Sequence, residues 1–196
     1  MVKRLRWLPL PLAFKEKVVR ANILPAGLYA VEAVWASKAT LSTFRAAIAN
    51  TLGPRSARAS NDIVFNNTTC AADLDPVTYI LTQRVMGLRR ILAKYPQLQS
   101  TVADLISNYH DARNSNATVE KPAGPIGLLL HSLEQVGACL SKDLVISKQC
   151  EADISLKDMP RQHLKKQLLK CQLTSAQPTP QKNVRILKTS RKPTTT

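Results

Sequence analysis

A proline in the middle of a helical pattern constrains the fold of this 196-residue chain more than any other feature. Because Pro25 has no amide hydrogen and fixes its own φ, it suits the first turn of a new helix and disfavours helical geometry at Leu24. Apolar residues recur at helical intervals on both sides of the proline, at Phe14, Val18 and Ala21 and again at Leu28, Val31 and Trp35. The pattern therefore predicts a helix, a sharp corner and a second helix.

A third helix is predicted to follow, with apolar residues at Leu41, Phe44, Ile48 and Leu52. A hydroxyl at Ser37 or Thr40 can accept a hydrogen bond from an unpaired amide in its first turn, and Gly53-Pro54 can end it. Three short helices with one apolar face each must pack on one another or on another partner.

Further helices are predicted downstream from the same apolar spacing, over residues 76–94, 97–113, 125–140 and 160–172. Residues 143–156 fit either a short strand or a helix end. Residues 1–10 are expected to form an extended lead-in, from which Trp7 can pack back on the first helices. The predicted fold class is all-α, an irregular, thumb-like helical bundle.

Composition divides the chain into four predicted regions. Residues 1–113 form a thumb-like helical region, 114–124 a linker loop rich in Asn, Ser, Thr, Pro and Gly, and 125–172 a second helical region. Whether the second region packs against the first is left open. Residues 173–196 are rich in Thr, Ser, Pro, Gln and Lys and contain no acidic residue, which predicts a disordered basic tail.

The charge of the chain points to a polyanionic partner. Its formal net charge is +15, from 28 basic and 13 acidic residues, and such a balance favours nucleic acid through counterion release. Residues 1–20 carry six basic side chains against Glu16 alone. A basic remnant without function would have the same composition, so charge alone does not decide.

Neither a metal site nor a membrane segment is predicted. The four cysteines, Cys70, Cys139, Cys150 and Cys171, are widely spaced and never form the close pairs that build a tetrahedral zinc site. The basic N-terminus is interrupted by Pro9 and Pro11, and no uncharged stretch is long enough to span a bilayer. The expected location is intracellular, in the nucleus or cytoplasm, and no cofactor is expected.

Four motifs in the first 58 residues resemble one known family. They are Leu-Pro-Leu-Pro at 8–11, Ile-Leu-Pro-Ala-Gly-Leu-Tyr-Ala-Val-Glu at 23–32, Leu-x-x-Phe-Arg-Ala-Ala at 41–47 and Gly-Pro-Arg-Ser-Ala-Arg at 53–58. Their order is similar to the segment after the palm in reverse transcriptases of non-LTR (LINE-type) retrotransposons. The resemblance covers residues 4–58 well and 73–96 more loosely, and Ala30 stands where the family pattern usually has glycine.

The resemblance implies a thumb that contacts the template–primer duplex, without the catalytic centre of the intact RNA-directed DNA polymerase. That centre needs paired aspartates to hold two metal ions, and the sequence contains no adjacent Asp-Asp pair. Asp73 and Asp75 are separated by Leu74, and Asp75-Pro76 is better explained as the start of a helix, with Asp75 as its cap. We therefore expect no enzymatic activity.

The candidate nucleic-acid-binding residues are basic side chains in a small polar loop and on the helix predicted over 76–94, namely Arg55, Arg58, Arg84, Arg89, Arg90 and Lys94. Such contacts position a phosphate backbone with low sequence specificity. A solvated linker explains the loop equally well. The expected partners are nucleic acid and a polymerase palm domain; the competing hypothesis is a helical interaction module, or a decayed remnant of a truncated reading frame, that needs a missing polymerase core.

Overall fold

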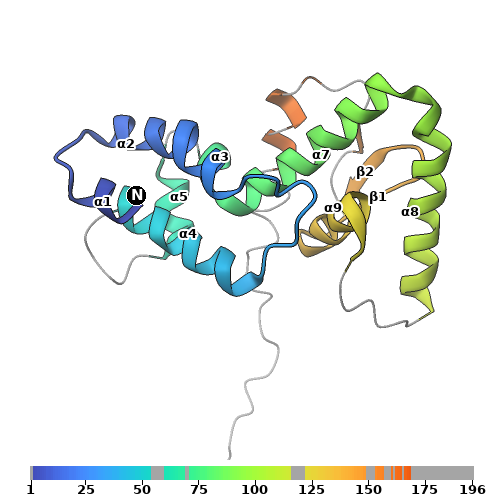
Figure 1. Cartoon of the computed structure of the whole chain (residues 1–196), viewed down its shortest axis with the longest axis horizontal. Coiled ribbons are helices and arrows are strands. Elements are labelled where there is room, and N and C mark those ends of the chain that lie inside the picture. The colour runs from blue at the N-terminus through green and yellow to red at the C-terminus, as the bar shows by residue number, and fades with distance from the viewer. Residues whose placement is uncertain are drawn as a thin grey trace, which may run out of the picture.

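The computed structural model describes residues 2–53, 60–68, 71–115, 122–148, 153–156, 160, 162–164 and 166–168. The described part is mostly helical, which confirms the predicted class, and carries one small sheet (Figure 1). Arg55, Arg58 and the predicted basic tail lie outside the described residues.

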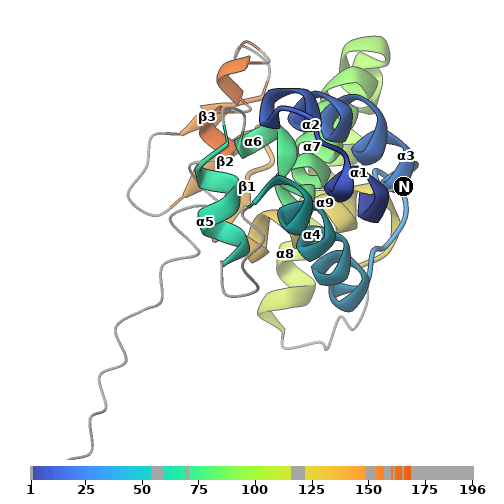
Figure 2. The same ribbon diagram turned by 90° about the vertical axis from the view of Figure 1, so that its left-hand side faces the viewer.

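The first half consists of short helices around one long one. They are α1 (Val2–Trp7), α2 (Leu12–Val18), a π-helical turn (Val19–Ile23), α3 (Leu24–Gly27), α4 (Lys38–Leu52), α5 (Asn61–Asn66) and α6 (Ala71–Leu74). The predicted extended lead-in is wrong, because residues 2–7 are helical and Trp7 points to solvent. Figures 1 and 2 place α1 against α4, where these two helices are in contact.

The second half is built from α7 (Pro76–Lys94), a 3₁₀ turn (Pro96–Leu98), α8 (Gln99–Asn114), α9 (Gly124–Gln135) and three strands. The strands β1 (Ala138–Leu140), β2 (Val145–Lys148) and β3 (Ile154–Ser155) form an antiparallel sheet in the order β1-β2-β3. Leu140 pairs with Ile146, and Ile146 with Ile154. The helix predicted to reach residue 140 therefore ends at Gln135, where Gly137 turns the chain with a positive φ of 69°.

The corner predicted at Pro25 is also wrong. The helix runs through the proline to Gly27, because the π-helical turn before it lets Leu24 N–H donate to Val19 O, five residues back. The chain leaves the helix only after Gly27; residues 28–33 form turns and 34–37 are irregular, in place of the predicted second helix. Ala30 adopts a positive φ of 57° in these turns.

The capping predictions for the two long helices are confirmed. Ser37 Oγ accepts from Thr40 N–H at 3.1 Å at the start of α4, and Asp75 Oδ1 accepts from Val77 N–H at 3.1 Å at the start of α7. Each bond satisfies an amide that has no partner within the helix. These caps explain why both helices begin close to where the sequence predicts.

Two apolar cores divide the described residues, and the boundary between them falls inside α7. The first core is formed by α1–α6 around Val19, Leu24, Ile48 and Phe65. The second joins α7 from Leu81 onward to α8, α9, the sheet, Leu164 and Leu168. Residues 81–113 therefore pack with the second half, although they belong to the predicted region 1–113. We call the two halves the N-terminal and C-terminal lobes.

One close contact in the N-terminal lobe depends on glycine. A Cβ atom on Gly27 would lie 2.7 Å from Phe44 Cζ, so a larger residue at this position would require the ring of Phe44 to move. Both residues belong to the motifs that carry the family resemblance. The motifs therefore have a packing role in this fold.

Candidate nucleic-acid interface

The side chain of Arg84 is buried between the two lobes and is only 7% exposed. Its guanidinium donates from Nε to Val31 O at 3.1 Å, from Nη2 to Val34 O at 3.2 Å and from Nη1 to Leu128 O at 3.1 Å; Nη1 also contacts Ser132 Oγ. Burial lowers the pKa of Arg84. Arg84 joins α7 to residues 31–34 and to α9, so the prediction that it contacts a phosphate backbone is wrong.

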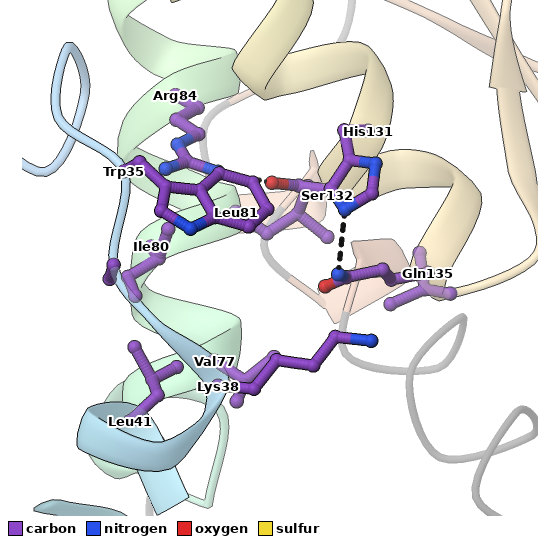
Figure 3. A pocket seen from close by; sticks show the side chains of 12 residues that line it. Trp35, Lys38, Leu41, Val77, Ile80, Leu81, Arg84, His131, Ser132 and Gln135 are labelled. Atoms are coloured by element: carbon purple, nitrogen blue, oxygen red, sulfur yellow. Dashed lines mark hydrogen bonds between the residues drawn. The ribbon is translucent and has the colours of Figure 1, made fainter. Parts of the chain in front are cut away.

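A small cavity of about 70 Å³ lies beside this guanidinium (Figure 3). Trp35 and His131 stand over it with their ring centres 5.2 Å apart, and Gln135 Nε2 lies 3.0 Å from His131 Nε2. Burial is the main cause that lowers the pKa of His131, so the neutral imidazole is favoured. The cavity has room for a few water molecules or one small polar group.

The other predicted cations on α7 do not share one surface. Arg90 and Lys94 are exposed one turn apart, whereas Arg89 is half-buried on another face. Arg90 Nη2 forms an ion pair with Glu32 Oε1 at 2.9 Å, and Lys94 Nζ lies 5.1 Å from the ring centre of Tyr95. The structure therefore brings together only Arg90 and Lys94, and Arg90 already has a carboxylate partner.

A denser group of cations occupies α1 and α2. Lys3, Arg4 and Lys17 are exposed, and Arg6 and Lys15 are half-buried. Among the described residues, none of the five forms an ion pair with a carboxylate. We call Lys3, Arg4, Arg6, Lys15 and Lys17 the N-terminal basic surface.

Two of these cations, Lys3 and Arg6, line an open groove between α1 and α4, with a volume of about 600 Å³. We call it the α1–α4 groove. Helix α1 contributes Lys3, Arg6 and Trp7, which share one face because they stand at i, i+3 and i+4. The side chains from α4 are small or polar, namely Ser42, Thr43, Ala46, Ala47, Asn50 and Thr51. A chain of phosphates and sugars can therefore approach α4 closely.

Two contacts fix the orientation of α1 over this groove. Leu5 is buried in the core of the N-terminal lobe, on the opposite face from the groove. Lys15 Nζ donates to Arg6 O at 3.3 Å, and Thr51 Oγ1 contacts Val2 O at 3.3 Å. Lys3 and Arg6 are consequently held toward the groove.

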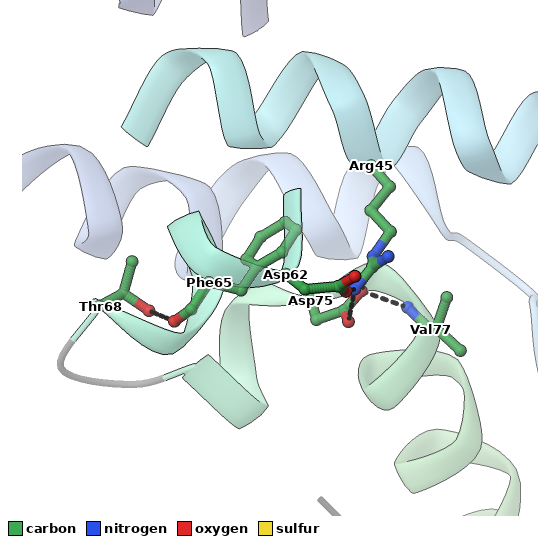
Figure 4. Close-up of polar contacts among 6 residues, drawn as sticks. All are labelled: Arg45, Asp62, Phe65, Thr68, Asp75 and Val77. Atoms are coloured by element: carbon green, nitrogen blue, oxygen red, sulfur yellow. Dashed lines mark hydrogen bonds and ion pairs between the residues drawn. The ribbon is translucent and has the colours of Figure 1, made fainter. Parts of the chain in front are cut away.

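The second wall, α4, is anchored to the start of α7 through Arg45 (Figure 4). Arg45 Nε donates to Asp75 Oδ1 at 3.0 Å and Nη2 to Asp75 Oδ2 at 2.8 Å, while Nη2 also lies 2.6 Å from Asp62 Oδ1. Burial acts to lower the pKa of Arg45, but the bonds and charges of Asp75 and Asp62 outweigh it and raise that pKa. Arg45, from the Phe-Arg-Ala-Ala motif, is therefore structural.

Sequence reasoning counted the basic residues of α1 and α2 but did not select them as a site. The signal that could have identified them is the spacing of Lys3, Arg6 and Trp7, which puts two cations and an aromatic ring on one helical face. In an extended chain, as predicted for residues 1–10, the same spacing does not place these side chains on one face. The wrong secondary structure concealed the site.

The described residues contain no group of three or more His, Cys, Asp or Glu side chains that could hold a metal ion. Asp73 lies 4.0 Å from Arg20 Nη1, and Asp75 is used by Arg45 and the α7 cap. His110 Nε2 contacts Leu140 O at 3.1 Å. No helix in the described ranges has the length and apolarity needed to cross a membrane.

Comparisons with known proteins add no relative: no family model matches the chain, and neither a curated protein nor a solved structure is similar to it. The interpretation of the site therefore depends on the motifs in the sequence and on the geometry described above.

Proposed function

We propose that this chain is a non-catalytic, thumb-like fragment related to LINE-type reverse transcriptases, and that it binds the backbone of nucleic acid. The N-terminal basic surface carries this proposal. Its five cations have no carboxylate partner among the described residues, and two of them, Lys3 and Arg6, line an open groove. Cations that are not already neutralised release the counterions of phosphates when they bind them, which drives association.

Ala30 gives independent support to the family relationship. It adopts a φ of 57°, a conformation that costs an L-residue roughly 1–2 kcal/mol and that glycine adopts freely. The family pattern usually has glycine at this position. If this chain and the family share a fold, the backbone at position 30 is expected to favour glycine, and its positive φ does.

The proposal makes a defined claim about wild-type binding. Affinity for an RNA–DNA hybrid, measured by fluorescence anisotropy over a range of salt, should fall with a log–log slope of roughly −0.9 for each phosphate neutralised. Scrambled sequences of equal length should bind equally well, because backbone contacts do not read bases. Binding that is indifferent to salt, or that depends on one sequence, would contradict this function.

A second candidate, a helical interaction module that needs a polymerase core, is favoured by an apolar groove between α7, α8 and α9. This groove has a volume of about 410 Å³, and Ile91, Leu98 and Leu105 expose large apolar side chains along it. Exposed apolar surface of this kind is typical of protein contacts.

The two candidates differ in a simple measurement. An interaction module should bind an apolar dye and form soluble aggregates, and Leu105→Glu should reduce both. A monodisperse protein that binds no dye would count against this candidate. That result would leave the proposed binding of nucleic acid untouched.

A further inference from the structure

We propose that the α1–α4 groove binds single-stranded nucleic acid, with an unpaired base stacked on Trp7 and the adjacent phosphates held by Lys3 and Arg6. This inference rests on the proposed function and adds the class of nucleic acid to it. It depends on three features of the groove: an exposed indole, cations on the same helical face, and a polar wall without large side chains.

The indole of Trp7 is held at the mouth of the groove and is 68% exposed. The helix that carries it is held by the burial of Leu5 and by the two contacts that anchor α1. A large, rigid aromatic ring with few rotatable bonds offers a stacking surface at little conformational cost. Unpaired bases stack on such rings whatever their identity, because every base has a π-face.

The cation nearest this ring is Arg6, whose guanidinium carbon lies 5.4 Å from the Trp7 ring centre. Its Nε atom is buried and has no hydrogen-bond acceptor. A phosphate beside the guanidinium would supply an acceptor after a small rotation of the side chain. Lys3, one turn earlier on the same face, would contact the neighbouring phosphate.

The α4 wall supplies polar groups that can bond to sugars, phosphates or base edges. Ser42 and Asn50 are exposed and make no hydrogen bond with another described residue. Ala46 and Ala47 leave the space between them open. A groove of about 600 Å³ falls within the range of roughly 300–1,000 Å³ that is typical of ligand sites, which suits one or two nucleotides.

Stacking separates single strands from duplexes. Bases inside a duplex are already stacked on their neighbours and present only their edges in the grooves, so Trp7 cannot reach a base face there. A strand without a complement exposes those faces. A duplex would therefore use only the cations of this surface, whereas a single strand would use the cations and the indole.

Trp7 can report on this contact directly. The chain has two tryptophans, so Trp35→Phe leaves Trp7 as its one indole fluorophore. Titration of this variant with a ten-nucleotide oligothymidine should quench the emission of Trp7. An abasic oligonucleotide of the same length carries the same phosphates but no bases; it should bind about five- to 100-fold more weakly and cause little quenching.

Substitution of the ring gives the second test. Trp7→Ala should bind oligothymidine no better than the abasic strand, and Trp7→Phe should retain part of the difference. Affinity for a duplex with the same number of phosphates should be unchanged. The matched control is Tyr29→Ala, which removes another aromatic ring that is 87% exposed but lies outside the groove, and should change nothing.

The outcomes distinguish the inference from the proposed function. Equal affinity for oligothymidine and the abasic strand, without quenching, would overturn the stacking site and leave backbone binding intact. Equal losses of single-strand and duplex affinity in Trp7→Ala would also overturn it. Failure of every nucleic acid to bind the wild-type chain would remove the proposed function, and the inference with it.

Discussion

The two lobes use their basic residues in different ways. In the N-terminal lobe, the cations of α1 and α2 are exposed or half-buried and have no ion-pair partner among the described residues. In the C-terminal lobe, Arg84 is buried against backbone carbonyls, and Arg113 pairs with Glu134 at 3.0 Å. The cations of α1 and α2 therefore keep their donors available, whereas Arg84 and Arg113, like Arg45 of the N-terminal lobe, use theirs within the fold.

This comparison teaches that the number of basic residues on a helix does not predict how many of them have donors available for a partner. A guanidinium surrounded by carbonyl oxygens has already used its donors, and its removal leaves those oxygens unpaired. A cation in solvent keeps its donors for phosphate. The following experiments test the distinction, beginning with the largest expected effect.

Loss of Arg84 should destabilise the fold most. Arg84→Ala removes the guanidinium donor from the carbonyls of Val31 and Val34, while Leu128 O keeps Ser132 Oγ at 2.8 Å, and we expect a loss of about 3 kcal/mol in the free energy of unfolding. The control Arg90→Ala breaks an exposed ion pair and should cost less than about 1 kcal/mol. Urea unfolding measures both, and similar losses would show that the burial of Arg84 contributes little.

Loss of Asp75 should come second. Asp75→Ala removes both the cap of α7 and the buried partner of Arg45, so we expect a loss of about 2–3 kcal/mol. The other carboxylate of that cluster, Asp62, is about half exposed, and Asp62→Ala should cost roughly 1 kcal/mol or less. Equal unfolding midpoints for the two variants would contradict the arrangement in Figure 4.

Replacement of Ala30 should stabilise the protein. Because Ala30 has a φ of 57°, Ala30→Gly relieves a strained backbone, although glycine also gives the unfolded chain more freedom. The net gain should be about 0.5–1 kcal/mol. The control Ala33→Gly, in the same segment but with a negative φ, should destabilise by a similar amount. A thermal melt in which Ala30→Gly unfolds at a lower temperature than wild type would exclude backbone strain at Ala30.

The smallest effect concerns pH. Burial lowers the pKa of His131, so the unfolded state takes up a proton at higher pH than the folded state does. The contribution of His131 to the free energy of unfolding is therefore fully present above about pH 6.5. It is lost as the pH falls through the lowered pKa that His131 has in the folded state. We expect His131→Gln to flatten this part of the stability profile in urea unfolding between pH 5 and 8. A parallel shift of the whole profile would assign the slope to other groups.

The sequence predicted those parts of the fold that local chemistry determines. Helices α4 and α7 were placed well because Ser37 and Asp75 cap them, and the apolar stripes between the caps are regular. The same spacing gave a wrong prediction for residues 28–37. Leu28 and Val31 fit a helical stripe, but the positive φ of Ala30 ends any helix there. Apolar spacing records which side chains are buried and does not record the backbone angle.

The candidate site was harder to predict because burial of a cation depends on tertiary contacts. Arg84 follows Leu81 by three positions and precedes Leu88 by four, so spacing alone puts it on the apolar face of α7. The sequence could not show that backbone carbonyl oxygens of residues far away in the chain accept hydrogen bonds from Arg84. Lys3 and Arg6 share one face only because that segment is helical, which the sequence did not predict.

The most direct test compares two variants with the same change in charge. Lys3→Gln, Arg4→Gln and Lys17→Gln together neutralise the exposed part of the N-terminal basic surface, and Lys94→Gln, Lys142→Gln and Lys166→Gln neutralise three exposed lysines of the C-terminal lobe. At 100 mM salt we expect the first variant to bind nucleic acid at least about tenfold more weakly, with a shallower salt slope by roughly 0.9 per lost contact, and the second to bind nearly as wild type. Equal losses in both variants, or a larger loss in the second, would contradict the assignment of binding to the N-terminal lobe.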